Sequence, residues 1–168
     1  FDKALEDVDK AIEIDQSYGI AYALKADIFY FDIGGSASQT KKMLNKAFEL
    51  SPDNPFVNFV KGDFHYDDSF ILLDKDKKEL AIKSAEKALI HFRKVVENSQ
   101  NNKDLIIKRI YPLGITYTAT AILGEAKFEL YFMYKDIKDR KTAKTYLEEA
   151  LSHYTCLLYT SDAADEGW

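Results

Sequence analysis

The sequence predicts an all-α protein built from antiparallel helix hairpins. Apolar residues recur at helical spacing, short polar or Gly/Pro-containing stretches separate the helical segments, and one helix-ending pattern occurs four times. The chain has 168 residues, of which 46% are hydrophobic and 14% aromatic. It is therefore long and apolar enough to bury a core, and its composition is not that of a disordered protein.

The N-terminal part predicts two helices. Over residues 1–14, apolar residues stand at positions 1, 4, 5, 8, 11 and 12, which is the stripe of a helix with one buried face. Asp15-Gln16-Ser17 ends this helix, and a second helix is expected over residues 19–32. Gly34-Gly35-Ser36 follows, and it predicts a turn because glycine adopts backbone angles that other residues avoid.

The third and fourth predicted helices are separated by prolines. Ser38 is the expected N-cap of the third helix, which runs to about Leu50. Pro52 cannot continue that helix, whereas Pro55 suits the first turn of the next one, where a missing N–H costs little. The fourth helix carries Phe56, Val57, Phe59, Val60, Phe64 and Tyr66.

The second half of the chain predicts longer helices. Residues 74–78 form a polar connector, and residues 79–97 form a fifth helix. After a turn cluster at 98–102, a helical region is expected from about 104 to 134, with Pro112 and Gly114 kinking or splitting it near residue 111. The last predicted helix spans about 140–154.

The four helix-ending segments share small residues that allow close helix contact and a larger residue that fills the space between them. They begin at Ala4, Thr40, Ala88 and Ala143. This pattern resembles the tetratricopeptide repeat family. The residues that carry the resemblance are Tyr22, Ala26 and Phe29 with Ala47 and Pro52, then Asn58, Gly62 and His65 with Ala88 and Phe92, and finally Ala126, Ala143 and Ala150.

The resemblance implies a right-handed α-solenoid over residues 1–155, made irregular by insertions, and it is closest over residues 1–66. Thr40 and Leu44 depart from the family pattern, which has alanine and an aromatic residue at these positions. The chain starts inside an apparent helix, with Phe1 in place of Met. We therefore expect it to be a fragment of a longer protein.

The resemblance also implies a scaffold that binds a partner protein or peptide on the concave face lined by the first helix of each pair. The positions that match the family's groove are Ile20, Ala23, Asp27, Tyr30, Phe31, Phe56, Phe59, Asp63, Tyr66 and Asp67. From these we assign Ala23, Asp27, Tyr30, Phe56, Phe59, Asp63 and Tyr66 to the partner site. Aromatic and acidic groups together favour a partner with an apolar anchor and a basic residue.

Three alternatives stand beside this interpretation. The aromatic residues could instead pack between helices, with apolar faces exposed at open ends of the solenoid. The chain could be a regulatory or substrate-presenting segment of a larger enzyme or transport system. It could also be a small-ligand-binding domain with an apolar pocket between the fourth, fifth and sixth helices.

The sequence offers little for catalysis, metals or nucleic acids. His65 falls on a packing position, and we expect His91 and His153 on helix surfaces; none of the three has metal-ligand spacing. The glycine turn lacks the Gly-Lys-Ser/Thr ending of a phosphate loop, and the net charge of −5 disfavours nucleic-acid binding. We therefore predict no enzyme activity, no cofactor, no metal, no nucleic-acid partner and no membrane span.

The C-terminal tail, residues 156–168, stands apart. Residues 156–166 resemble the translation of a DNA sequencing adapter, so we expect this tail to be non-native. It contains the chain's single Cys and single Trp. The domain proper is therefore expected to be cysteine-free, without disulfide or thiol chemistry.

Overall fold

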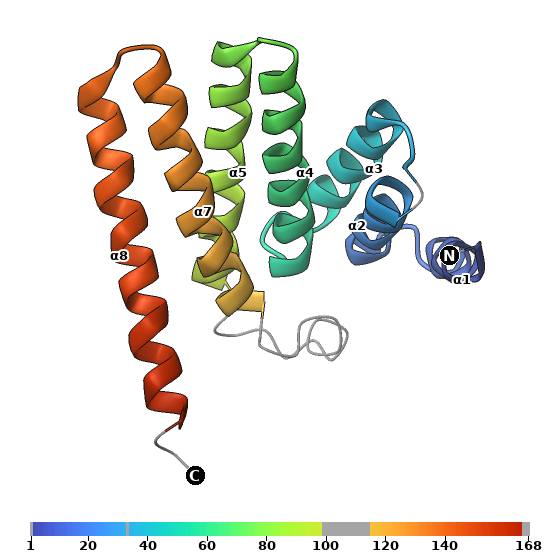
Figure 1. Ribbon diagram of the computed structural model, residues 1–168. Helices are drawn as coiled ribbons and strands as arrows, with labels where there is room; N and C mark the ends of the chain where they lie inside the picture. The colour runs from blue at the N-terminus through green and yellow to red at the C-terminus, as the bar shows by residue number, and fades with distance from the viewer. Residues whose placement is uncertain (1, 33, 99–114, 166–168) are drawn as a thin grey trace. The chain divides into compact units, whose positions relative to one another are not determined.

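The computed structural model describes residues 2–32, 34–98 and 115–165, and all regular structure in these ranges is helical (Figure 1). The all-α class predicted from the sequence is confirmed. The elements are α1 (Asp2–Ile14), α2 (Gly19–Asp27), the π-helical segment η1 (Ile28–Asp32), α3 (Ala37–Leu50), α4 (Pro55–Asp74), α5 (Lys78–Asn98), α7 (Ile115–Asp136) and α8 (Arg140–Asp165). The chain divides into two units, Phe1–Lys61 and Gly62–Trp168, which are described separately.

Unit 1 is held together by the apolar stripe of α1 and by close packing of α2 on α3. Val8, Ala21 and Ile28 form a buried cluster, against which further apolar side chains pack: Leu5, Ala11, Ile12, Tyr18 and Leu24. Lys25 of α2 forms an ion pair with Asp9 of α1. A Cβ at Gly19 would lie 2.5 Å from Oγ of Ser51, so only glycine allows this approach of α2 to the end of α3.

The loop between α2 and α3 differs from the sequence prediction in two details. The helix expected over residues 19–32 ends in the π-helical segment η1, and the N–H of Gly35 folds back to donate to the carbonyl of Phe29 at 2.7 Å. Helix α3 begins at Ala37, two residues earlier than predicted, so Ser36 is its N-cap and the assignment to Ser38 is wrong. Ser36 takes the N-cap place because its backbone is extended and its carbonyl accepts hydrogen bonds from the N–H and hydroxyl of Thr40.

Helix α4 starts as the sequence predicts. Oδ1 of Asn54 accepts hydrogen bonds from the backbone N–H groups of Phe56 at 2.9 Å and Val57 at 3.2 Å, while Pro55 occupies the first helical position. The amide of Asn58 donates to the carbonyl of Pro52 at 2.7 Å, which fixes the incoming chain. These bonds satisfy donors that a bare helix end would leave without partners.

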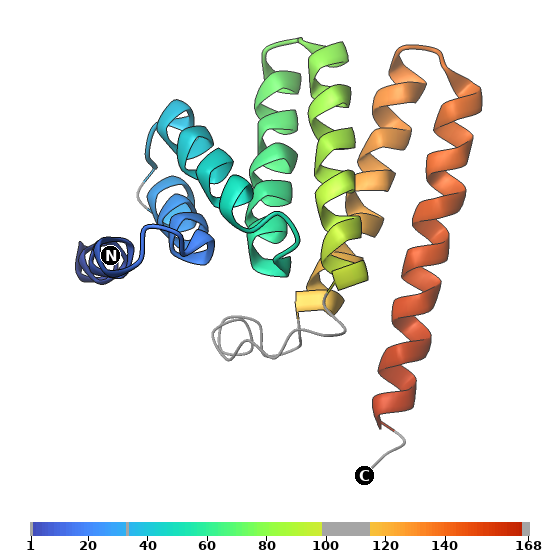
Figure 2. The same ribbon diagram turned by 180° about the vertical axis from the view of Figure 1, so that it is seen from behind.

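In unit 2, helices α5, α7 and α8 lie side by side in both views (Figure 1, Figure 2). The C-terminal part of α4 packs on α5, where a Cβ at Gly62 would lie 2.8 Å from the ring of Phe92. The buried apolar residues of this unit include Ala81, Ala85, Ala88, Leu89, Phe92, Val95, Ala119, Leu123, Ala126, Leu130, Met133, Ala143 and Ala150.

Two matching turns connect the helices of unit 2. Between α4 and α5, Lys77 donates to the carbonyl of Leu72, and Asp76 adopts a positive φ of 55°. Between α7 and α8, Asp139 donates to the carbonyl of Tyr134, and Lys138 adopts a φ of 64°. Both turns have the six-to-one hydrogen bond and left-handed residue of a Schellman motif, without the usual glycine.

The helix predicted over about 140–154 continues to Asp165, because no glycine or proline interrupts the chain between Arg140 and Glu166. The kink expected from Pro112 and Gly114 lies outside the described residues. Among the helices that the structure describes, none is long and apolar enough to span a membrane.

Candidate functional site

One face of α4 in unit 2 carries the polar and aromatic residues of the candidate site. Asp63, Tyr66 and Asp67 stand three and four residues apart, which places them on one side of the helix. All three are partly buried. The ring of Phe70, one turn further on, meets Tyr66 edge-on with 4.9 Å between ring centroids. The helix therefore presents an aromatic pair flanked by two carboxylates.

Helices α7 and α8 bring further carboxylates and a second tyrosine to the same place. The pKa of the Tyr66 hydroxyl is raised, first by burial and then by the negative charges of Glu125 and Glu129, with smaller effects from Tyr154 and Asp63. Burial and the same two glutamates raise the pKa of Tyr154. We call Asp63, Tyr66, Asp67, Glu125, Glu129 and Tyr154 the acidic–aromatic face.

Close helix packing places Tyr154 in this face. A Cβ at Gly124 would lie only 3.2 Å from Cε1 of Tyr154, so the small residue on α7 allows the tyrosine of α8 to approach. Glu125 and Glu129 lie one turn apart on α7, on one side of the helix. The face thus depends on how α7 and α8 pack together.

Asp63 is the most perturbed carboxyl of the face. Burial raises its pKa to about 6, and the neighbouring charge of Asp67 adds to the effect. An ionised Asp63 is therefore held at an energetic cost near neutral pH. A cation placed beside it would relieve that cost, because an opposite charge favours the ionised form.

Two polar clusters link the helices of unit 2. Oε1 of Glu86 on α5 accepts hydrogen bonds from the hydroxyls of Tyr134 at 2.7 Å and Tyr146 at 3.4 Å, and the two tyrosine rings stack.

The second cluster centres on Lys127, which is 5% exposed and lies 2.7 Å from Oε2 of Glu149 and 2.9 Å from Nε2 of His153. Burial and the charge of Lys127 lower the pKa of His153.

The histidines differ in part from the sequence prediction. His91 is 9% exposed, so its assignment to a helix surface is wrong. Its ring stacks on that of His65 across α4 and α5, with 5.9 Å between centroids and 11° between planes. Helix α5 packs against α4 on one side and α7 on the other, so most of the surface of α5 is covered. His91 is therefore buried. His153 is partly buried in the Lys127 cluster.

Of the seven predicted partner-site residues, three are buried and four are partly buried. Ala23 and Phe56 are fully buried in this structure and Phe59 is 6% exposed, so all three have a packing role. Asp27 and Tyr30 of unit 1 are partly buried. Of the remaining predicted groove positions, Ile20 is buried, Asp67 belongs to the acidic–aromatic face, and the side chain of Phe31 lies outside the described residues.

The sequence analysis assigned Asp63 and Tyr66 to the site. The structure adds Glu125, Glu129 and Tyr154, which the sequence analysis did not assign to it. A search for carboxylates at four-residue spacing would have found the glutamate pair. Nothing in the sequence says that this side of α7 lies near Tyr66.

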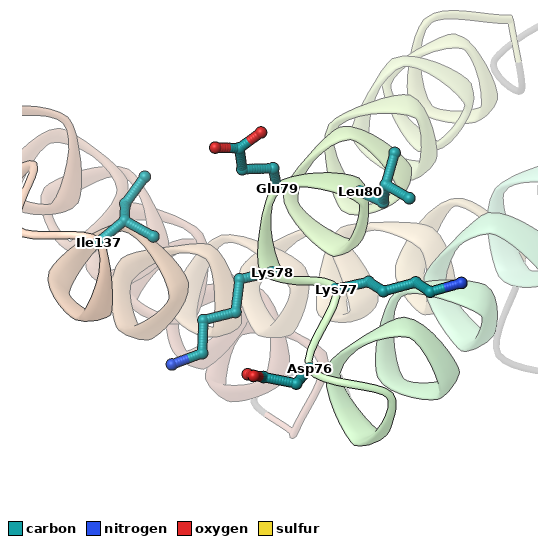
Figure 3. Close-up of a pocket in the computed structure, with 6 residues that line it drawn as sticks. All are labelled: Asp76, Lys77, Lys78, Glu79, Leu80 and Ile137. Atoms are coloured by element: carbon teal, nitrogen blue, oxygen red, sulfur yellow. The ribbon is translucent and has the colours of Figure 1, made fainter.

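The described residues include no group of three or more His, Cys, Asp or Glu side chains placed to hold a metal ion. A hollow of about 570 Å³ lies where the α4–α5 turn approaches Ile137 of the α7–α8 turn. Figure 3 shows that Lys77 and Lys78, which line it, extend in opposite directions. The lining therefore does not converge on one point, as a small-ligand site would require.

Comparisons with models of protein families, with curated proteins and with solved structures find no match for this sequence. The resemblance to tetratricopeptide repeats therefore has to be argued from the packing of the helices.

Proposed function

We propose that this chain is a tetratricopeptide-like scaffold that binds a protein or peptide segment through the acidic–aromatic face. The bound segment carries an apolar or aromatic anchor next to Lys or Arg. The observation that carries the proposal is a partly buried aromatic pair on α4, Tyr66 and Phe70, with the negative charges of Asp63, Glu125 and Glu129 close enough to raise the pKa of Tyr66.

The repeat part of the proposal is supported by the burial of small residues at the positions that carry the sequence pattern. In the first helices of the pairs these residues are Ala26, Gly62 and Ala126, and in the second helices they are Ala47, Ala88, Ala143 and Ala150; all are buried. The contact between Gly62 and Phe92 is the kind of small-to-large packing that the pattern predicts. Ala4, in the first copy, is exposed and does not follow this rule.

The binding part follows from charge and burial. Aromatic rings supply contact area at low entropic cost, and partly buried carboxylates select a cationic partner and repel an anionic one. Arg or Lys would meet Asp63 and the two glutamates while its neighbouring apolar side chain contacts the rings of Tyr66 and Tyr154. An Arg guanidinium can also stack on a tyrosine ring.

The test is a binding titration with labelled peptides of about 12 residues, a length typical of recognised linear segments. One peptide carries leucine or tyrosine flanked by arginines, and its partner carries glutamates in place of the arginines. We expect only the cationic peptide to bind, and Tyr66→Ala combined with Glu125→Gln to weaken it about tenfold or more. Glu79→Gln, an exposed acid on α5, is the control and should leave affinity unchanged.

Salt and pH give independent readouts. Affinity should fall as ionic strength rises, because charge pairs at the surface are screened. It should also fall as the pH drops through about 6, where Asp63 takes up a proton. Equal binding of both peptides, or an unchanged affinity of the Tyr66→Ala variant, would overturn the proposal.

A further inference from the structure

The outer seam of α7 and α8 forms a groove whose charged lining has the opposite sign to that of the acidic–aromatic face. It has a volume of about 320 Å³ and is lined by Tyr131, Lys135, Arg140, Ala143, Lys144 and Leu147. Every ionisable side chain among these, apart from the tyrosine hydroxyl, is a cation. In a chain with a net charge of −5, this is a local reversal of sign.

The carboxylates nearest in sequence do not line the groove. Asp136 pairs with Lys78 of α5 at 3.6 Å, and Asp139 accepts hydrogen bonds from the N–H and hydroxyl of Thr142 at the start of α8. Glu148 lies 3.6 Å from Lys144, but both side chains are well exposed. An exposed pair of this kind is weak and is easily exchanged for a partner's carboxylate.

An exposed aromatic cluster continues from Tyr131 along α7 toward Glu125 and Glu129, outside the lining of the groove. Phe128 and Phe132 are 38% and 43% exposed, and their rings meet edge-on at 5.0 Å. Tyr131 lies 4.9 Å from Phe132 between ring centroids. On α8, Leu151 is 56% exposed and stands one turn beyond Leu147 on the same side. Apolar residues of this size grouped on a surface mark an interaction site.

We infer that this groove binds an amphipathic helix of a partner protein whose apolar stripe is flanked by Asp or Glu. The stripe would lie over Tyr131 of α7 and Leu147 of α8, which line the groove from its two sides. The flanking carboxylates would meet Lys135, Arg140 and Lys144 at one end of the groove. A helix is the expected form because the groove follows a straight seam between two helices, which suits anchors at i, i+3, i+4 and i+7.

The test uses the full chain and a labelled synthetic peptide of about 16 residues, with leucines at helical spacing and glutamates elsewhere. Fluorescence anisotropy measures its binding to the wild type and to an Arg140→Glu/Lys144→Glu variant. We expect the double substitution to weaken binding about tenfold or more. Both positions are exposed, and an acidic residue near the start of α8 is compatible with the helix dipole, so the variant should fold.

Lys141→Glu is the matched control, because it makes the same charge change in the same turn of α8 outside the groove. It should bind the acidic peptide as the wild type does, and Leu147→Ala, which shortens an apolar side chain of the groove, should bind it more weakly. The inference is wrong if Lys141→Glu weakens binding as much as the double substitution does. It is also wrong if a peptide with lysines in place of the glutamates binds with the same affinity. Sedimentation of the chain alone should show a monomer. Self-association that the Arg140→Glu/Lys144→Glu variant abolishes would overturn the inference, because the groove would then bind a second copy of the chain.

Discussion

Replacing Asp63 by Asn should stabilise the folded chain while weakening its binding of cationic peptides. Burial raises the pKa of this carboxyl from the ordinary 3.8 to about 6. That difference corresponds to about 3 kcal/mol of destabilisation when the group is ionised. An asparagine amide in the same place also loses water, so we expect about 1–2 kcal/mol of the cost to be recovered at pH 8.

The effect depends on pH with a definite sign. Because the folded-state pKa is raised, the protonated group favours the folded state, and this advantage is lost as the pH rises from about 4 through about 6. Thermal unfolding should therefore show a melting temperature about 3–6 °C higher for Asp63→Asn at pH 8 and no difference near pH 4. Asp74→Asn, an exposed position on the same helix, should change the melting temperature by a degree or less.

Two results would contradict this prediction: Asp63→Asn no more stable than the wild type at pH 8, or a gain in stability that is the same at both pH values. The first result would mean that the ionised carboxyl is not strained, and the second that the gain has a different origin. If Asp63→Asn is more stable but binds the peptide as tightly as the wild type, the Asp63 carboxylate does not contribute to binding.

Three further substitutions test the packing that positions the face. Asn54→Ala should cost about 1 kcal/mol in urea unfolding because it removes the cap of α4, and a change below a few tenths would contradict the capping geometry. Lys138→Gly should raise the melting temperature by about 3 °C, since glycine tolerates the φ of 64°; a decrease would mean that the lysine side chain has a role of its own. Gly62→Ala should destabilise the chain by about 1–3 kcal/mol, because its Cβ would lie 2.8 Å from the ring of Phe92, and calorimetry showing an unchanged melting temperature would contradict this contact.

The helices could be predicted from the sequence because their signals are local. Pro55 at the start of α4 and Gly34 in the α2–α3 loop stand where backbone geometry requires them, and the structure places both as expected. Ser36 and Ser38 could both cap α3, and the choice depends on which serine has an extended backbone. The last helix was predicted to end near residue 154, just before the tail, but no residue there breaks the helix and it continues to Asp165.

The candidate site could be predicted only in part, because a face assembled from several helices depends on packing between segments far apart in the sequence. Asp63 and Tyr66 follow from their spacing on one helix. Glu125 and Glu129 join them only because α7 packs where it does, and no local signal in the sequence specifies that packing. Residues Phe56 and Phe59 share the periodicity of groove positions, yet they are buried, because periodicity defines a face and does not say what covers it.

The most direct test of the proposed function is chemical-shift mapping by nuclear magnetic resonance during titration with the arginine-flanked peptide. We expect shifts concentrated at Asp63, Tyr66, Glu125, Glu129 and Tyr154, which weaken as the pH falls below about 6. Shifts confined to α1–α3, or no shifts at peptide concentrations in the millimolar range, would contradict it.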